Sequence, residues 1–256
     1  MKVAIVTGAS SGLGKEFVKQ LDERYSDSVE EFWLIARRGD RLRQVAAKTQ
    51  IPCRILELDL TDRESIDELS EELAKEKPEV TFFVNAAGLG RLGRIDEVDL
   101  DDLDATIDLD CRAAVASTKA VIPYLKKKSR VLEICSTAGF QPMPRLNVYS
   151  ASKAFLINFT KLLHHELLFK GVHVTAVCPY WIKDTEFIQN AERTGKAYGH
   201  YILANKASTV VKWALFDSAA NFWVSTPGPV CFAHRIFAAI LPNVATVPFM
   251  ELFRRI

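Results

Sequence analysis

The sequence lacks any long apolar run and any excess of charge of one sign. Its 33 lysine and arginine residues nearly balance its 32 aspartate and glutamate residues, giving a formal net charge of +1. Such a balance creates no field that would favour a nucleic acid or an anionic membrane as partner. No stretch reaches the roughly 20 apolar residues of a membrane span, and Gly8 interrupts the first apolar run before a signal peptide could form. We therefore expect a cytoplasmic protein that acts on a small molecule.

Paired cysteines are also missing. The five cysteines stand singly, with no C-x-x-C pair and no histidine at the spacing of a metal ligand. An odd number of isolated cysteines does not indicate a disulfide framework, so we interpret them as reduced thiols of a cytosolic protein. The sequence predicts no metal site.

What is present is an alternation of short runs rich in β-branched residues with longer amphipathic segments, typical of βαβ units around a parallel sheet. The expected strands cover residues 2–7, 31–36, 53–58, 81–85, 130–135 and 172–178, with a seventh near 223–226. The expected helices, in which apolar residues recur every three or four positions, cover residues 14–25, 40–48, 62–76, 100–127 and 149–169. The pattern predicts one α/β domain over residues 1–256, a Rossmann-type doubly wound parallel sheet of about seven strands with helices on both faces.

A glycine-rich turn follows the first expected strand. The strand ends in Thr7-Gly8, and the run Ala9-Ser10-Ser11-Gly12-Leu13-Gly14 leads directly into a helix. A dinucleotide pyrophosphate requires this order, because it needs a tight turn, a close approach of the backbone and the free N–H groups of a helix N-terminus. The context therefore favours a phosphate-binding turn over a merely flexible one.

A second group of residues is suited to acid–base chemistry. Tyr149 and Lys153 lie four residues apart at the start of an expected helix, and Ser136 directly follows an expected strand. Reduction of a ketone requires a hydride and a proton for the oxygen that becomes anionic, and an adjacent ammonium makes a phenol a better acid–base group. A hydrolase built on Ser136 is the competing interpretation, but Ser136 lacks a Gly-x-Ser-x-Gly elbow and the histidines at 164 and 165 lie within a helix.

Together these motifs resemble the short-chain dehydrogenase/reductase family, whose signature Thr-Gly-x-x-x-Gly-x-Gly matches residues 7–14 and whose Asn-Ala-Gly element is similar to residues 85–88. The resemblance extends to about Thr185. It implies that Tyr149 is the general acid in reduction, that Ser136 donates a hydrogen bond to the substrate oxygen, and that Lys153 also holds the nicotinamide ribose. It implies a cofactor site formed by Gly8, Ser10, Ser11, Gly12, Leu13, Gly14, Arg37, Arg38, Asp59, Leu60, Asn85, Ala86, Gly88, Tyr149, Lys153, Pro179, Ile182 and Thr185.

The choice of cofactor is expected at the end of the second strand, where an acidic residue binds the ribose of NAD and an arginine accommodates the 2′-phosphate of NADP. Here the strand leads into Arg37 and Arg38 with no carboxylate before them. Guanidinium groups suit phosphate oxygens, so the sequence favours NADP(H) over NAD(H). The alternative is that the two arginines only solvate a loop, and Ser11, where many NADP-preferring relatives carry a basic residue, gives no second indication.

The sequence departs from the family at two positions. Asp110 stands where relatives carry an asparagine that completes a catalytic tetrad and helps to hold a proton-relay water, and Tyr180 replaces a glycine after Pro179. If the relay needs the side-chain amide, a carboxylate near Lys153 would instead stabilise the ammonium and change the pH optimum. Two functions therefore stay open: an NADP(H)-dependent oxidoreductase that interconverts a ketone and a secondary alcohol, and a catalytically weak dinucleotide-binding regulator.

The resemblance further implies a substrate lid over residues 180–207 and an apolar C-terminal extension over residues 229–256. The aromatic residues Tyr180, Phe187, Tyr198 and Tyr201 would favour a hydrophobic substrate such as a steroid or an acyl compound, unless they pack in the core or at a subunit interface. The extension would close the pocket, cover a sheet edge, join an oligomer or make peripheral contact with a membrane. Family members commonly form homodimers or homotetramers through the helices expected over residues 100–127 and 149–169.

Overall fold

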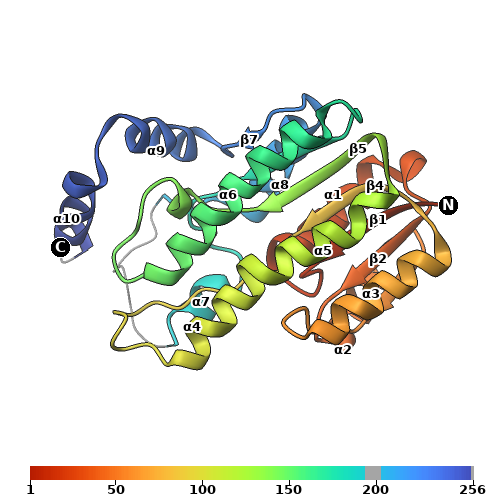
Figure 1. The fold of residues 1–256 in the computed structure, drawn as a ribbon, viewed down its shortest axis with the longest axis horizontal. Coiled ribbons are helices and arrows are strands. Elements are labelled where there is room, and N and C mark those ends of the chain that lie inside the picture. Colours follow the sequence, from red (N-terminus) through yellow and green to blue (C-terminus); the bar gives the residue numbers. More distant parts are fainter. Residues whose placement is uncertain (194–202, 255–256) are drawn as a thin grey trace.

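The computed structural model describes residues 1–193 and 203–254, and within them a parallel sheet of seven strands forms the centre (Figure 1). The strands are β1 (Lys2–Thr7), β2 (Glu31–Ile35), β3 (Cys53–Leu56), β4 (Glu79–Asn85), β5 (Leu125–Ile134), β6 (His173–Val177) and β7 (Val224–Ser225). Their order is β3-β2-β1-β4-β5-β6-β7, and every neighbouring pair is parallel. The order reverses between β1 and β4, where open α/β sheets bind their ligands. The predicted doubly wound Rossmann-type fold is thus confirmed.

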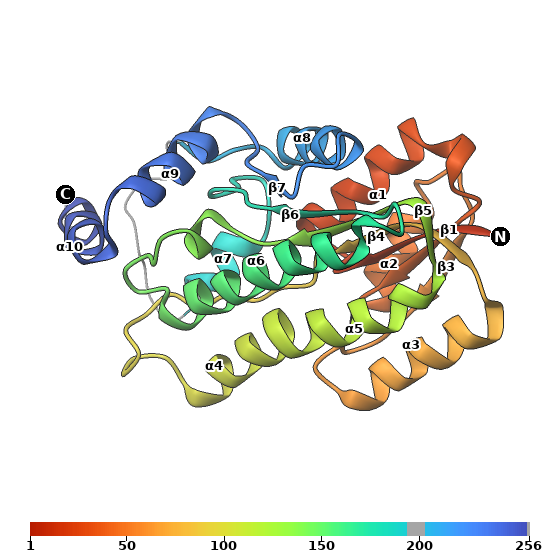
Figure 2. The same ribbon diagram turned by 45° about the horizontal axis from the view of Figure 1, so that its top comes forward.

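Helices cover both faces of this sheet (Figure 2). They are α1 (Gly12–Arg24), α2 (Gly39–Ala46), α3 (Arg63–Glu76), α4 (Leu100–Ile107), α5 (Ala114–Val121), α6 (Asn147–Leu168), α7 (Phe187–Ala191), α8 (Ala207–Ala219), α9 (Pro229–Ile240) and α10 (Asn243–Arg254). Alternate residues of β1 point to opposite faces: Ala4 and Val6 pack in the core with α1 and α8, and Val3 and Ile5 in the core with α3 and α6. The continuous apolar run of β1 follows from burial on both sides.

The helix expected over residues 100–127 is confirmed in part: residues 100–121 are helical, but they are not one uninterrupted α-helix and they end earlier than expected. The chain forms α4, then a π-helical turn over Asp108–Ala113, then α5, and enters β5 at Leu125. Pro123 lacks a backbone N–H and follows the end of α5, which explains why the helix stops there. β5 begins at Leu125, earlier than expected. The hydropathy pattern does not reveal this first part of the strand, because Lys126, Lys127 and Lys128 are charged and exposed.

The two segments that depart from the βα alternation lie beyond the carboxyl end of β6. In the lid expected over residues 180–207, the described residues 180–193 and 203–207 form α7 and a parallel bridge between Ile182 and Asn205. Tyr198 and Tyr201 lie outside the described residues. The C-terminal extension forms α9 and α10, which reach to the end of the molecule opposite the N-terminus (Figure 1). Within residues 1–193 and 203–254, no helix has the length and apolarity that crossing a bilayer requires.

Candidate active site

Three glycines shape the turn between β1 and α1. Gly8 and Gly12 adopt positive φ angles of 64° and 52°, which side chains rarely tolerate. A Cβ atom on Gly8 would lie 2.8 Å from the carbonyl oxygen of Ala86, and one on Gly14 would lie 2.4 Å from the carbonyl oxygen of Gly8. The turn therefore brings bare backbone to the N-terminus of α1, whose first turn carries no acidic residue. This cradle fits the pyrophosphate of a dinucleotide.

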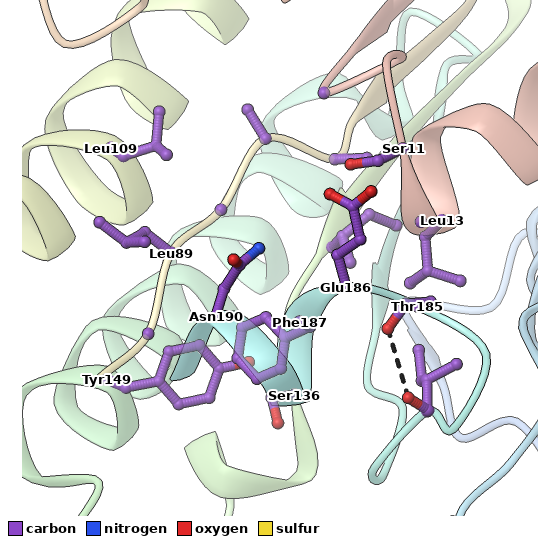
Figure 3. A pocket seen from close by; sticks show the side chains of 18 of the residues that line it. Ser11, Leu13, Leu89, Leu109, Ser136, Tyr149, Thr185, Glu186, Phe187 and Asn190 are labelled. Carbon is purple, nitrogen blue, oxygen red and sulfur yellow. Dashed lines mark hydrogen bonds between the residues drawn. The ribbon is translucent and has the colours of Figure 1, made fainter. Parts of the chain in front are cut away.

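A cavity of about 460 Å³ extends from this turn to Tyr149 (Figure 3). Many of its lining residues lie at or just after the carboxyl ends of the strands. It is lined by Ser136 and by all the expected cofactor residues except Gly14 and Asn85. Gly14 lies against the carbonyl of Gly8, and Asn85 is buried beneath the floor of the cavity. Further lining residues, which no sequence motif indicates as part of the site, include Leu89, Gly90, Arg91, Leu109, Met143, Trp181, Glu186 and Asn190.

Asn85 joins the elements under the cavity. Its Oδ1 accepts a hydrogen bond from Thr7 Oγ1 at 2.9 Å, and its Nδ2 donates to the carbonyl oxygen of Ala114 at 3.1 Å. Thr7 Oγ1 also accepts from the N–H of Ala87 at 3.0 Å. These bonds connect β1, β4 and the start of α5, so Asn85 fixes the backbone that forms the cavity floor.

Ser136, Tyr149 and Lys153 line the same end of the cavity. Ser136 follows β5, and its Oγ accepts a hydrogen bond from the N–H of Ala138 at 3.1 Å. Tyr149 and Lys153 are one turn apart on α6, and the Lys153 Nζ lies 5.5 Å from the centre of the Tyr149 ring. Figure 3 shows Tyr149 and Ser136 beside Phe187, whose ring centre is 5.4 Å from that of Tyr149. The structure thus brings together three groups that the sequence placed up to 17 residues apart.

Asp110 forms a buried ion pair with Lys153. Its Oδ2 lies 3.2 Å from the Lys153 Nζ and accepts a hydrogen bond from Ser152 Oγ at 3.3 Å, while its Oδ1 accepts from the N–H of Leu89 at 2.9 Å. Lys153 also donates to the carbonyl oxygen of Ile134 at 3.1 Å. The π-helical turn places Asp110 at this position, in keeping with the frequent occurrence of such turns at functional sites.

This ion pair determines the charge state of the site. Burial alone would lower the pKa of Lys153, but the nearby Asp110 carboxylate outweighs it, so the pKa is raised and the ammonium is retained. Desolvation raises the pKa of Tyr149; the Lys153 ammonium opposes this rise and the Asp110 carboxylate adds to it. The phenol of Tyr149 therefore keeps its proton at neutral pH.

A further buried carboxyl group lies behind the site, on β5. Glu133 Oε1 accepts a hydrogen bond from Thr118 Oγ1 at 2.7 Å, whereas Oε2 has no hydrogen-bond partner among the described residues. Burial raises the pKa of Glu133 to about 7. Glu133 is not among the residues predicted from the sequence, although a charged residue within the apolar run Val131–Leu132–Ile134 is a visible signal.

Arginines border the opposite end of the cavity. Arg37 is exposed, and its guanidinium lies 3.5 Å from an oxygen of Asp59. Arg38 Nη2 lies 3.1 Å from Ser11 Oγ and 3.4 Å from Ser10 Oγ, in the glycine-rich turn. Glu186, from the segment after β6, accepts hydrogen bonds from Arg38 at 3.2 Å and from Arg41. Guanidinium groups therefore stand where the turn would hold a phosphate.

Apolar side chains surround the end with Tyr149. Leu92, Ala138, Met143, Leu146, Trp181 and Ala191 form a buried cluster, against which Tyr149, Tyr180, Phe187, Ile188, Ala204 and Met250 pack. Met250 belongs to α10, so the C-terminal extension contributes to this cluster. The N–H of Tyr180 donates to Cys231 Sγ at 3.2 Å, and the Tyr180 ring contacts His234. The residue that replaces the family's glycine thereby connects the segment after β6 to α9.

Residues 2–196 match the model of the family described as short chain dehydrogenase. Over 180 residues the chain is 31% identical to an uncharacterized oxidoreductase of Staphylococcus epidermidis, covering 70% of this chain and 76% of that protein. Over 190 residues it is 34% identical to a very-long-chain 3-oxoacyl-CoA reductase of Anas platyrhynchos, covering 70% of this chain but 59% of that longer protein.

Solved structures share the fold. A short-chain dehydrogenase from Sphingobium yanoikuyae in complex with NADPH superposes with a TM-score of 0.78 at 22% identity, covering 95% of this chain and 97% of that one. A closed form of serine dehydrogenase complexed with NADP+ gives a TM-score of 0.72 at 27% identity, covering 85% of this chain and 89% of that one. The expected enzyme class, an NAD(P)-dependent oxidoreductase, is confirmed, and the chain belongs to the short-chain dehydrogenase family.

Proposed function

We propose that this chain is an NADP(H)-dependent oxidoreductase that interconverts a ketone and a secondary alcohol on a hydrophobic substrate. One observation carries the proposal: Ser136, Tyr149 and Lys153 line the same cavity as the glycine-rich turn, with the ammonium of Lys153 fixed by a buried carboxylate. A site that only binds a dinucleotide does not need a tyrosine and a lysine arranged in this way. The arrangement supports proton transfer next to a bound cofactor.

The cavity has a suitable group for each part of a dinucleotide. The glycine-rich turn and the N-terminus of α1 would hold the pyrophosphate, Asp59 and Leu60 would border the adenine, and Lys153 would bind the nicotinamide ribose. Pro179, Ile182 and Thr185 would contact the nicotinamide. When bound, the dinucleotide supplies or accepts the hydride.

The chain itself moves the proton. In reduction, the hydroxyl of Tyr149 donates its proton to the substrate oxygen as negative charge develops there, and the hydroxyl of Ser136 donates a hydrogen bond to the same oxygen. The ammonium of Lys153 stabilises the phenolate that remains. Asp110 is a positioning residue, since it acts through Lys153. The raised pKa of Tyr149 keeps the hydroxyl protonated at neutral pH, as its role as proton donor in reduction requires.

The arginines support NADP(H) over NAD(H). β2 ends at Ile35, no carboxylate precedes Arg37 and Arg38, and both arginines line the cavity. A guanidinium binds phosphate oxygens through two parallel hydrogen bonds, which a ribose hydroxyl cannot accept in the same way. Similar solved structures carry NADPH or NADP, although a 3-ketoacyl-(acyl-carrier-protein) reductase from Brucella melitensis carries NADH.

The apolar cluster at the Tyr149 end supports a bulky hydrophobic substrate, since Trp181, Phe187 and Met143 all line the cavity. The likeness to a very-long-chain 3-oxoacyl-CoA reductase agrees with an acyl substrate. A steroid is the other hydrophobic class that such a cluster would accept.

We also infer a cytoplasmic homodimer or homotetramer that pairs through α4, α5 and α6. Phe155 and Leu162 on α6 are exposed apolar side chains that such pairing would cover. Phe232 and Ile240 on α9 are exposed as well, and they support either subunit contact or peripheral contact with a membrane surface.

The test is an assay of NADPH and NADH oxidation against long-chain 3-oxoacyl thioesters, steroid ketones and small carbonyl compounds. We expect turnover with NADPH on at least one hydrophobic ketone and slower turnover with NADH. Tight binding of NADPH without turnover on any compound would support the second candidate, a dinucleotide-binding regulator. Two observations favour that candidate: Asp110 in place of asparagine and Tyr180 in place of glycine.

A further inference from the structure

The carboxylate of Glu186 forms ion pairs with Arg38, at the phosphate end of the cavity, and with the nearby Arg41. Glu186 Oε2 lies 3.2 Å from Arg38 Nη1, and Oε1 accepts a hydrogen bond from Arg41. Arg41 and Arg38 together hold the pKa of Glu186 below its usual range, so the carboxylate is ionised at neutral pH. Figure 3 shows this carboxylate directed toward Ser11 in the glycine-rich turn.

Three separate elements meet at this contact. Arg38 and Arg41 belong to the start of α2, Ser11 precedes α1, and Glu186 precedes α7. Arg38 also reaches Ser10 and Ser11, so a single guanidinium connects the carboxylate to the phosphate-binding turn. The side chains of Arg38 and Glu186 are each 41% exposed, and a cofactor entering the cavity can therefore reach them.

We propose that Glu186 is a cofactor-specificity residue whose carboxylate competes with the 2′-phosphate of NADP(H) for Arg38 and Arg41. This inference rests on the proposed function, in which Arg38 faces that phosphate; Arg41 shares the carboxylate of Glu186 with Arg38. A phosphate has three acceptor oxygens and close to two negative charges, so it displaces a carboxylate that has two oxygens and one charge. The 2′-hydroxyl of NAD(H) has neither property and leaves Glu186 paired with the arginines.

The exchange would act on the segment that closes the cavity. Thr185 lies over Gly12, where an added Cβ atom would be 3.6 Å from the Thr185 side chain, and Phe187 packs on Tyr149. Glu186 stands between these two contacts. The ion pairs of Glu186 therefore help to hold the start of α7 in place beside the cavity. A bound 2′-phosphate would break these ion pairs and form its own hydrogen bonds to the arginines.

The experiment measures the affinities of adenosine 2′,5′-bisphosphate and 5′-AMP by calorimetry, because these probes differ only in the 2′-phosphate and need no turnover. We expect Glu186→Gln to bind the bisphosphate about two- to fivefold more tightly than the native protein, the range for removing a competing exposed ion pair. The affinity for 5′-AMP should change less than about twofold, because 5′-AMP does not contact the competing group. Glu68→Gln, the same charge change on the exposed face of α3, should leave both affinities unchanged.

Each other outcome overturns the proposal in a distinct way. If Glu186→Gln weakens binding of the bisphosphate, then Glu186 orients the arginines for phosphate and does not compete with it. If the affinity does not change, the contact is irrelevant to cofactor binding. If the native protein binds both nucleotides equally, then the preference for NADP(H) fails together with the inference, whereas the first two outcomes leave that preference intact.

Discussion

The Nζ atom of Lys153 lies 3.2 Å from the Oδ2 atom of Asp110, and both side chains are almost completely buried. An isolated charge at such a depth would be costly, so each group stabilises the charged form of the other. The pair also has a chemical consequence for Tyr149, because the carboxylate offsets part of the acidifying effect of the ammonium on the phenol. A neutral side chain at position 110 would not do this.

Asp110→Asn should therefore move the pH profile of alcohol oxidation toward lower pH. Oxidation requires the Tyr149 phenolate as base, and the Asp110 carboxylate raises the pKa of Tyr149. Without that carboxylate the phenol ionises at lower pH, so the rate of oxidation begins to rise at a lower pH. The measurement is the rate of NADP+ reduction with a secondary alcohol across pH 6 to about 11, on either side of the unperturbed phenol pKa.

Asp108→Asn is the matched control, because Asp108 belongs to the same π-helical turn but is exposed and paired with Arg112. Its profile should coincide with that of the native protein. A profile of Asp110→Asn that stays in place or moves to higher pH would show that Asp110 does not act on Tyr149.

Glu133→Gln should change how stability depends on pH. The pKa of Glu133 is about 7 in the folded protein against 4.5 for the free carboxyl. Between these values the folded protein retains a proton that the unfolded chain has lost, so the free energy of unfolding falls as the pH rises through this window. Each pKa unit corresponds to about 1.4 kcal/mol, which gives a loss of roughly 3 kcal/mol by pH 8.

A glutamine does not titrate and avoids this loss. The measurement is urea unfolding at pH 5 and pH 8. Between these pH values, the free energy of unfolding of Glu133→Gln should rise relative to that of the native protein by about 2 kcal/mol or more. The exposed Glu68→Gln should show no such trend. A difference between Glu133→Gln and the native protein that is the same at both pH values would mean that Glu133 is ionised throughout.

Arg38→Ala should weaken the binding of NADPH by about 10- to 100-fold, since it removes a charged partner of the 2′-phosphate. The affinity for NADH should change by less than about threefold, because NADH lacks that phosphate. Arg43→Ala, on the exposed side of α2, is the control of equal charge. Fluorescence titration measures both affinities. Equal losses of affinity for NADPH and NADH would mean that Arg38 acts on the pyrophosphate or on folding.

Gly90→Ala should lower kcat without weakening NADPH binding. A Cβ atom at position 90 would lie 2.9 Å from Cδ2 of Tyr149 and 3.0 Å from Cζ of Phe187, so one of the rings must move. A displacement of the proton donor by about 1 Å can cost up to roughly 100-fold in rate. Steady-state kinetics and a cofactor titration on the same preparation separate the two effects; an unchanged kcat would show that only Phe187 yields.

The sequence allowed the sheet and the catalytic group to be predicted because their signals are local. Most strands contain a short apolar run. Tyr149 and Lys153 lie one turn apart on one helix, so spacing alone brings them together. The prediction of Arg38 at the cofactor has a similar basis, because Arg38 lies in the short segment between β2 and α2.

The remaining features depend on tertiary contacts. Glu186 meets Arg41 across 145 residues of sequence, from a segment without periodicity. The apolar run of β5 indicates that Glu133 is buried, but its hydrogen bond to Thr118 and its unpartnered Oε2 atom depend on the side chains that pack around it in the described structure. The π-helical turn at Asp108–Ala113 shifts the helix by a fraction of a turn, below what apolar periodicity resolves.

The central claim, that Tyr149 is the proton donor, is tested most directly by Tyr149→Phe with Tyr180→Phe as control, since both tyrosines line the cavity. The measurement is NADPH oxidation on a hydrophobic ketone together with the dissociation constant of NADPH. We expect Tyr149→Phe to lose about 100- to 10,000-fold in kcat, the contribution of a positioned general acid, while NADPH affinity stays within a few-fold and Tyr180→Phe retains turnover. Turnover of Tyr149→Phe close to that of the native protein would contradict the claim.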